Sequence, residues 1–299
     1  MTADVGLIHS RATPEAPGRV VLLGGGGFIG GRLRAALARA RIPTLAPRRS
    51  ELDLAGGEAA THLRELLRPG DAVVVLAALT PDKGRGLVPF MANLAMAAGV
   101  CIALEKVDTS HVVYFSSDAV YGAATGRLTE ASCAEPNDLY GTMHLAREVM
   151  IRASARGPVA VLRPTLVFGA DDTHNSYGPN RLRRMAQKDG RIVLFGEGEE
   201  MRDHVEVDDV AALTLEVLRH RSAGTLNVAS GRAISYAELA RKVARLFDRP
   251  IAITGTPRQT PITHRHFDVT ALRRAFPTFA FTTLDDGLAR AHREMLEQG

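Results

Sequence analysis

The 299-residue sequence predicts an α/β fold in which helices cover both faces of a parallel sheet, with a smaller C-terminal lobe of mixed α and β structure. In the first half, short apolar runs alternate with amphipathic stretches, as in successive βα units. The runs are apolar at consecutive positions, as expected of strands buried on both faces. After Thr165 a long polar loop and shorter elements follow, which marks the change from sheet to lobe.

The elements of the sheet can be placed in order along the first half. RVVLLGG predicts the first strand, and a helix follows from about Phe28 to Ala40. Helical stretches also separate the later strands. The five strands are expected at residues 19–25, 42–47, 72–78, 111–117 and 159–165.

The second half begins with a turn-rich polar loop, FGADDTHNSYGPN (168–180), which is too long for a simple connection and is a candidate binding loop. The last helix is expected to begin near Thr283, because Asp285 and Asp286 then occupy its favourable first turn. The other elements expected here are strands at 191–195 and 224–230 and helices at 207–220 and 235–247.

These elements divide the chain into two units. A dinucleotide-binding sheet domain is expected over 19–168, with 204–229 returning to it. A substrate-binding lobe is expected over 169–203 and 230–299. Residues 1–18 are expected to form a disordered tail.

The composition is that of a soluble protein, with 45% hydrophobic and 23% charged residues. Cys101 and Cys133 are too few for a disulfide framework, which indicates a reducing compartment. The longest apolar stretches, near 72–79 and 94–104, are too short to cross a bilayer. The first 18 residues lack the basic start and apolar run of a signal peptide. We therefore expect a cytoplasmic protein with no membrane partner.

The net charge of +4 does not indicate a nucleic-acid-binding protein. Basic and acidic residues are interspersed, and the chain has five tyrosines and no tryptophan for stacking on bases. Positive charges that face phosphorylated small molecules explain the balance equally well. No nucleic-acid partner is expected.

A glycine-rich segment, LLGGGGFIGGRL (22–33), follows the first expected strand and opens the first expected helix. Gly24, Gly27 and Gly30 recur every three residues. Glycines at such a junction let the backbone turn sharply and approach a pyrophosphate, which then lies at the helix N-terminus. The segment predicts a dinucleotide site and a Rossmann-type sheet.

The end of the second expected strand selects the cofactor. An acidic residue there would bind the ribose 2′-hydroxyl of NAD. This chain has Arg48 and Arg49 at that place, and arginine forks suit a phosphate. The pair therefore favours NADP(H) over NAD(H), although two solvated arginines are the alternative.

Several motifs in order resemble those of the extended short-chain dehydrogenases/reductases, in the sugar-nucleotide epimerase/dehydratase branch, over residues 19–297. The motifs are GGGGFIG, ELDL (51–54), VVVLAAL (73–79), YFSSDAVYG (114–122), LRPTLVFG (162–169), MRDHVEVDDVA (201–211) and LNVASGRAISYAELA (226–240). The resemblance implies further cofactor contacts from Phe28, Ile29, Asp53, Leu54, Ala77, Ala78, Ser116, Pro164 and Leu166. It also implies that relatives dimerise through two helices, here near 85–106 and 137–155.

The resemblance assigns catalysis to Tyr140 and Ser117. Tyr140 falls at the acid/base tyrosine, which moves a proton while hydride passes to or from the nicotinamide. Ser117 falls where a serine or threonine binds the reacting sugar oxygen. A free tyrosine has a pKa of about 10, so it needs help to act as a base near neutrality.

His144 departs from the family pattern, in which this position is a lysine that binds the nicotinamide ribose and favours the phenolate. Neutral imidazole can still bind ribose hydroxyls, but it stabilises a phenolate far less. A working site with His144 on the ribose is the favoured interpretation. The alternative is a protein that binds cofactor without turnover.

Asp118 follows Ser117, but Ala119 stands where dehydratases of the family carry a glutamate. A 4,6-dehydration is therefore disfavoured. Asp118 remains either a second proton donor or a hydrogen-bonded turn residue.

The resemblance also implies substrate-binding residues in the second half: Arg202 matches an arginine that binds the nucleotide-sugar diphosphate in relatives, and Asn180 and Arg181 match a phosphate-contacting stretch. For each arginine alone, a solvated surface residue is the alternative. An always-charged planar guanidinium suits a diphosphate. The residues expected to bind an anionic nucleotide-sugar are Asn180, Arg181, Arg184, Arg202 and Arg265. His264 and His266 lack cysteine or acidic partners at metal-ligand spacing, so no metal site is expected.

The expected function is that of an NADP(H)-preferring oxidoreductase acting on a nucleotide-linked sugar, most simply a 4-keto-sugar reductase. Two alternatives remain open. One is an NAD-dependent nucleotide-sugar epimerase with a tightly held cofactor, and the other is a non-catalytic cofactor-binding sensor or regulatory protein.

Overall fold

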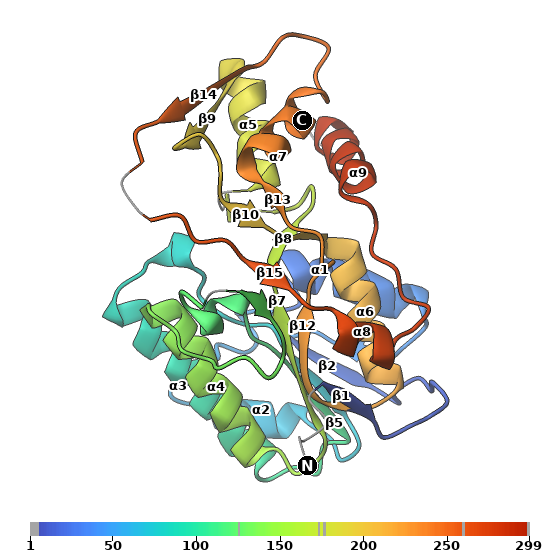
Figure 1. Cartoon of the computed structure of the whole chain (residues 1–299). Coiled ribbons are helices and arrows are strands. Elements are labelled where there is room, and N and C mark those ends of the chain that lie inside the picture. Colours follow the sequence, from blue (N-terminus) through green and yellow to red (C-terminus); the bar gives the residue numbers. More distant parts are fainter. Residues whose placement is uncertain (1–5, 125, 173, 176–177, 259–260, 298–299) are drawn as a thin grey trace.

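The computed structural model describes residues 6–124, 126–172, 174–175, 178–258 and 261–297. Its centre is a sheet with strand order β1-β12-β7-β5-β4-β2-β3 (Figure 1). Neighbouring strands are parallel except for β1 and β12. The predicted doubly wound α/β fold is therefore confirmed. The strands are β1 (Leu7–His9), β2 (Val20–Leu23), β3 (Thr44–Leu45), β4 (Ala72–Val75), β5 (His111–Phe115), β7 (Val159–Pro164) and β12 (Ser222–Val228).

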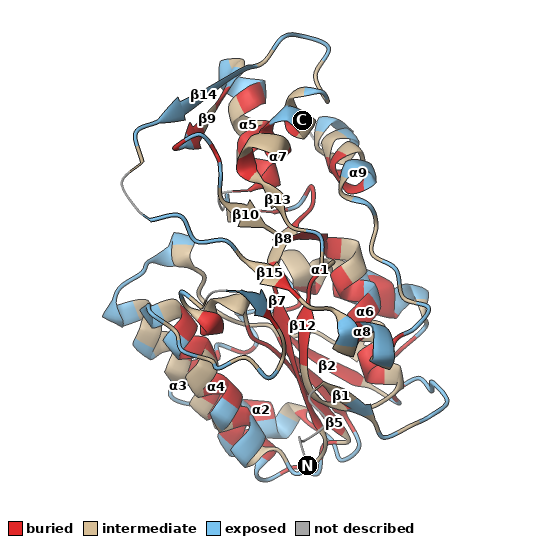
Figure 2. Cartoon of the chain, in the orientation of Figure 1, coloured by how far each residue is buried: buried red, intermediate tan, exposed pale blue. Residues whose placement is uncertain are grey.

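Helices cover both faces of this sheet (Figure 1). Neighbouring residues of β2 point to opposite faces, as the pleat requires: Leu22 packs in one core and Val21 in the other. Figure 2 shows the central strands buried between the two helical layers. One layer contains α1 (Phe28–Arg39), α6 (Val207–Arg219) and α8 (Thr270–Ala275); the other contains α2 (Ala59–Leu66), α3 (Leu87–Leu104) and α4 (Leu139–Ser154).

The strand order reverses at β2. The chain runs from β2 to β3 on one side and then to β4 on the other. In open parallel sheets such a switch point opens a crevice outside the carboxyl ends of the strands, where ligands bind. The fold therefore places the glycine-rich segment after β2 beside the segment that follows β4.

The expectation of a disordered tail over residues 1–18 is wrong for its described part. Residues Leu7–His9 form β1, which pairs antiparallel with β12. The His9 ring bonds to the Ser222 hydroxyl and to the Ala275 carbonyl, each at 2.8 Å. Without β1, the backbone groups of β12 would form an open sheet edge. A three-residue strand is too short to show a hydrophobic pattern.

The C-terminal lobe has a core of its own around Leu182, Leu194, Leu239 and Leu288. Its main elements are α5 (Pro179–Asp189), β9 (Arg191–Phe195), α7 (Tyr236–Ala244), β14 (Ala252–Thr256) and α9 (Leu284–Glu297). The remaining short elements are η1 (Pro81–Lys83), η2 (Asp118–Tyr121) and β6 (Arg127–Leu128) in loops of the sheet domain, and β8 (Leu166–Phe168), β10 (Met201–Arg202), β11 (His204–Glu206), β13 (Ile234–Ser235) and β15 (His266–Phe267) later in the chain.

Among the described helices, α3 alone is long and apolar enough to cross a membrane by length and composition. It is longer than the apolar run at 94–104 that the sequence showed. In the fold α3 packs between α2 and α4, and 44% of its residues are buried there.

Candidate active site

A cavity of about 630 Å³ lies at the carboxyl ends of β2, β3 and β4. It lies at the switch point of the sheet, as expected for a dinucleotide. Arg34, Leu79 and Met96 also line it, and the sequence pattern had not identified them. The predicted cofactor residues in its wall are Gly24, Gly27, Arg48, Arg49, Asp53, Leu54, Ala77 and Ala78.

The glycine-rich segment forms a cradle at one end of this cavity. Gly24 has a φ of +97°, and a Cβ there would lie 2.7 Å from the backbone nitrogen of Ala77. A Cβ on Gly30 would overlap the carbonyl oxygen of Gly24, whereas one on Gly26 would meet open space. No side chain caps the N-terminus of α1 at Gly27, so its first N–H groups are left for an anion. The cradle therefore fits a dinucleotide pyrophosphate.

Three arginines line the same cavity as the glycine-rich segment. Arg34 lies on α1, and Arg48 and Arg49 follow β3. Arg49 is exposed and pairs with Asp53 at 3.6 Å. Neither Arg34 nor Arg48 forms an ion pair with a residue that the structure describes. Two solvent-exposed cations without a carboxylate partner among the described residues therefore line the cavity, and their contact with a cofactor phosphate stays a prediction.

Tyr140 is positioned by the start of α4. The Asp138 carboxylate caps the helix by accepting the Gly141 N–H at 2.7 Å. A Cβ on Gly141 would overlap the Ala119 carbonyl oxygen, so only glycine lets α4 lie this close to η2. This approach brings the Tyr140 phenol within hydrogen-bonding reach of the Ser117 hydroxyl. The predicted catalytic pair is therefore brought together.

Burial, as the larger cause, and the nearby charge of Asp118 raise the pKa of Tyr140 to about 12. The Arg147 cation and the hydrogen bond from Ser117 act in the opposite direction. The phenol is therefore protonated at neutral pH. Tyr140 also lines a small cavity of about 100 Å³ that shares Leu79 with the dinucleotide cavity, so the two cavities adjoin, and the predicted contact of Tyr140 with the cofactor stays a prediction.

His144 is buried one turn after Tyr140. Its Nδ1 lies 2.8 Å from the Tyr114 hydroxyl, and its ring meets the Tyr140 ring edge-on at 4.7 Å. Burial lowers the pKa of the imidazole to about 3, and the charge of Arg147 acts in the same direction. If Tyr114 donates to Nδ1, the proton of His144 is on Nε2, which is buried and has no partner in the described part of the chain. An unsatisfied buried donor of this kind would suit a ribose hydroxyl, but His144 is in the wall of neither cavity, so its predicted contact with the cofactor stays a prediction.

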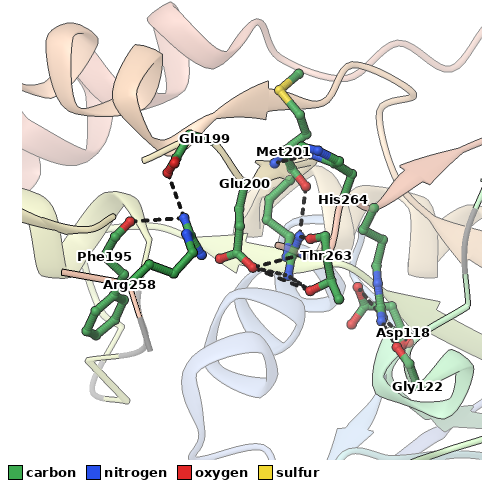
Figure 3. Close-up of polar contacts among 11 residues, drawn as sticks. Asp118, Gly122, Phe195, Glu199, Glu200, Met201, Arg258, Thr263 and His264 are labelled. Carbon is green, nitrogen blue, oxygen red and sulfur yellow. Dashed lines mark hydrogen bonds and ion pairs between the residues drawn. The ribbon is translucent and has the colours of Figure 1, made fainter. Parts of the chain in front are cut away.

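Asp118 is bound by Arg265 from the loop before β15. The Arg265 guanidinium donates to the backbone carbonyls of Asp118 and Gly122 and pairs with the Asp118 carboxylate at 3.4 Å (Figure 3). Burial raises the pKa of Asp118, whereas the charges of Arg265 and Arg202 lower it. Arg265 therefore attaches the late loop to the active-site turn, and its predicted contact with substrate stays a prediction.

Ser116 belongs to a buried polar network. Its hydroxyl donates to Glu148 at 2.5 Å, and Glu148 accepts two bonds from Arg163 at 2.9 and 2.6 Å. Tyr121 lies 3.0 Å from Arg163 and bonds to Asn227 at 2.7 Å. Any cofactor contact from Ser116 would therefore come from its backbone.

Four other predicted cofactor residues lie outside the wall of the cavity. Phe28 packs edge-on against His174, with 6.4 Å between ring centroids. Ile29 packs on the apolar core. Pro164 ends β7 and Leu166 begins β8. Their contacts with a cofactor stay predictions.

The predicted substrate residues divide between two places. Asn180 is buried and donates to the Gly169 carbonyl at 2.7 Å and to Asp172 at 3.0 Å, and Arg184 donates to the Asp172 carbonyl. Arg181 precedes Arg184 on α5 by three residues. These three therefore lie together on the polar loop and the start of α5.

The second place is around Arg202, on β10. Its guanidinium donates to the carbonyl and hydroxyl of Thr263 and lies 3.7 Å from Glu200 (Figure 3). Arg202 thus meets the same late loop that carries Arg265. The structure joins these two predicted residues at one border of the active site.

Comparison with known proteins identifies the family. A family model described as the NAD dependent epimerase/dehydratase family matches residues 20–229. The chain is 34% identical over 144 residues to an ADP-L-glycero-D-manno-heptose-6-epimerase of Pseudomonas paraeruginosa (strain DSM 24068 / PA7), and the match spans 44% of each protein.

Two solved structures have the same fold. One is a Thermus thermophilus UDP-glucose 4-epimerase complex with NAD (TM-score 0.79, 19% identity, covering 93% of this chain and 99% of that one). The other is a Naegleria fowleri GDP-L-fucose synthetase bound to NADP (TM-score 0.82, 17% identity, covering 100% and 98%). The family model spans the sheet domain and the catalytic segment, and the chain therefore belongs to the NAD-dependent epimerase/dehydratase family.

Proposed function

We propose that the chain is an NADP(H)-preferring oxidoreductase that acts on a nucleotide-linked sugar, most simply as a 4-keto-sugar reductase. The observation that carries this proposal is the position of a protonated Tyr140 beside Ser117, next to a cavity that fits a dinucleotide. The heptose epimerase, the UDP-glucose epimerase and the GDP-L-fucose synthetase all act on nucleotide-sugars by name, which supports this substrate class.

The protonation state of Tyr140 is compatible with the reductive direction. Burial raises the pKa of Tyr140 to about 12, so the phenol carries a proton at neutral pH that it can give to the substrate. In reduction, the bound nicotinamide supplies hydride to the carbonyl carbon. Tyr140 gives its proton to the carbonyl oxygen, and Ser117 holds that oxygen by a hydrogen bond. Ala119 offers no second carboxylate, which argues against dehydration.

The arginines support NADP(H). Arg34 and Arg48 would each meet a 2′-phosphate with a fork of N–H donors, and a charge-assisted bond of this kind contributes about 1.5–3 kcal/mol. NADPH is therefore expected to bind at least tenfold more tightly than NADH. The solved structures of this fold include both NAD and NADP complexes, so the choice depends on this chain's own residues.

An epimerase is the second candidate, favoured by the similarity to a heptose epimerase. An epimerase recycles its cofactor, so the nucleotide need not leave. The first test is therefore the identity of any nucleotide released from the purified protein on denaturation. The reductase predicts no retained stoichiometric NAD; retained NAD would favour the epimerase.

Titration of the emptied protein with NADPH and NADH tests the arginines. Arg34→Gln and Arg48→Gln are each expected to weaken NADPH about tenfold and to leave NADH within about twofold. Arg39→Gln, at the far end of α1 and outside the cavity wall, is the matched control. Equal losses for both cofactors would reject the 2′-phosphate assignment. Binding of neither cofactor would reject the dinucleotide site.

The exposed face of α3 supports a homodimer. Leu87, Val88, Met91 and Ile102 on α3 and Val149 on α4 are exposed apolar side chains. A second copy of this face would cover them and form a four-helix contact. Light scattering tests this: Val88→Glu with Met91→Glu is expected to give monomers, and a monomeric parent protein would refute the dimer.

A further inference from the structure

The face of α4 that carries Tyr140 and His144 also carries Arg147. These residues stand at positions i, i+4 and i+7 of the helix, so their side chains lie along one side. His144 contributes no charge there, because its buried ring stays neutral. Arg147 is 1% exposed and is the cation next along this face.

Arg147 is buried without an anionic partner in the described part of the chain. Its Nη2 donates to the Ala77 carbonyl at 2.8 Å, and its Nη1 lies 3.5 Å from Asn93 Oδ1 and 3.8 Å from Met143 Sδ. Its Nε is buried with no acceptor. An unpaired buried charge is costly, in contrast to Arg163, which has Glu148. The fold therefore retains a net positive charge at this point.

The guanidinium reaches back along α4 toward the catalytic pair. It lies over the Tyr114 ring, 5.3 Å from the centroid, and the hydroxyl of that tyrosine binds His144. Two side chains bind the segment after β4. Arg147 donates to the Ala77 carbonyl, and Asn93 bonds to both backbone groups of Leu79. Ala77 and Leu79 line the dinucleotide cavity. The Arg147 charge thus lies against the segment that lines the dinucleotide cavity, on the side of α4 that carries Tyr140.

The other charged and titratable groups around Tyr140 do not provide this charge. Asp118 on η2 and Asp138 at the helix cap both disfavour the phenolate of Tyr140. Burial keeps Tyr114 and His144 neutral, and Arg85 lines the small cavity from a solvent-exposed position. Arg265 is paired with Asp118. Of these groups, only Arg147 stabilises the phenolate form of Tyr140 by its charge.

We propose that Arg147 is a positioning residue that supplies to Tyr140 the positive charge that His144 cannot carry, while His144 offers its Nε2–H to the cofactor ribose. The two tasks that the family resemblance gives to one lysine are then divided between two side chains on successive turns. The inference concerns the same site as the proposed oxidoreductase activity and rests on it for its role in turnover. The electrostatic effect itself can be measured without turnover.

The test places a trifluorotyrosine at position 140 by codon suppression and follows its ionisation by ¹⁹F NMR. The fluorinated ring ionises well below tyrosine, within the pH range of stable proteins. Seven residues of helix separate Tyr140 and Arg147 by roughly 10 Å along the axis, and a charge at that distance, with an effective dielectric constant of about 20, shifts a pKa by about one unit. Arg147→Met is therefore expected to raise the pKa of the probe by about one unit, and Arg147→Lys is expected to keep it near the parent value.

Two more variants separate charge from shape. Arg147→Gln keeps a donor for the Ala77 carbonyl without the charge, and it should raise the pKa of the probe as much as Arg147→Met. It also serves if the methionine variant does not fold. His144→Lys combined with Arg147→Met moves the cation one turn closer to Tyr140 and should return the pKa to the parent value or below it.

An unchanged probe pKa in Arg147→Gln would overturn the proposal. A probe pKa that rises as much in Arg147→Lys as in Arg147→Met would also overturn it, because the shape of the guanidinium and not its charge would then matter. In unlabelled enzyme, the pH profile of sugar oxidation by NADP⁺ should shift upward with the same variants. Absence of turnover in the parent protein would reject the proposed function, whereas the NMR result would still decide the role of Arg147.

Discussion

Removal of the Glu148 carboxylate should destabilise the fold more than any surface ion pair can. Glu148 accepts two bonds from Arg163 and one from Ser116, and the side chains of the ion pair are only 8% and 4% exposed. In Glu148→Leu, Arg163 keeps the Tyr121 hydroxyl at 3.0 Å and the Tyr121 ring at 5.1 Å. Neither neutralises its charge. Leaving one buried partner uncompensated costs about 3–5 kcal/mol.

The measurement is urea unfolding at pH 7, followed by circular dichroism. The double variant Glu148→Leu with Arg163→Met removes both charges and should recover most of the loss. Asp108→Asn is the control, since Asp108 and Arg156 form an exposed pair at 2.9 Å that contributes less than about 1 kcal/mol. If Glu148→Leu lowers the free energy of unfolding by less than about 1 kcal/mol, or if the double variant is no more stable than the single one, then unpaired Arg163 is not costly in the fold.

Three further predictions concern the site and its surroundings. Tyr140→Phe should lower turnover at least 100-fold by removing the proton donor, while NADPH affinity by fluorescence stays within about threefold; intact turnover would reject the assignment. Gly141→Ala should lower kcat about tenfold in steady-state assays, because its Cβ would push α4 away from Ala119, and an unchanged kcat would contradict that geometry. His204 has both ring nitrogens buried without partners in the described region, and burial lowers its pKa to about 3. The unfolded chain therefore binds a proton that the fold excludes between about pH 6.5 and 3, so stability falls as pH falls through that window; His204→Phe should flatten this loss in urea unfolding at pH 5 and 8, and identical pH slopes would contradict it.

The sheet was predictable because its signals are local. Apolar runs at 20–23, 72–75 and 111–115 identify strands whether or not their partners are known. The rhythm of Gly24 and Gly30 has a direct steric cause, since side chains there would collide with Ala77 and with the end of β2. By contrast, the second strand shrinks from the expected 42–47 to Thr44–Leu45, where Pro43 and Pro47 on either side lack the N–H that a ladder needs.

The features that the sequence missed depend on distant contacts. β1 exists only because β12 presents a free edge more than 200 residues later. Arg34 is one of several arginines on α1, and only the fold shows that it lines the cavity. Arg147 lies seven residues beyond Tyr140, outside the Tyr140–His144 spacing. Its place on the same face of the helix as Tyr140 could have identified it. Only the structure shows that no carboxylate among the described residues pairs with it.

Transfer of deuterium from NADPH labelled at the nicotinamide C4 to a nucleotide-linked 4-keto sugar would show directly that the protein is a 4-keto-sugar reductase. The product is analysed by mass spectrometry, with Tyr140→Phe as the control. The reductase account predicts one deuterium at sugar C4 for each NADPH oxidised, and none in the control. Conversion of the sugar without net NADPH oxidation, or no transfer from NADPH or NADH to any 4-keto sugar, would contradict it.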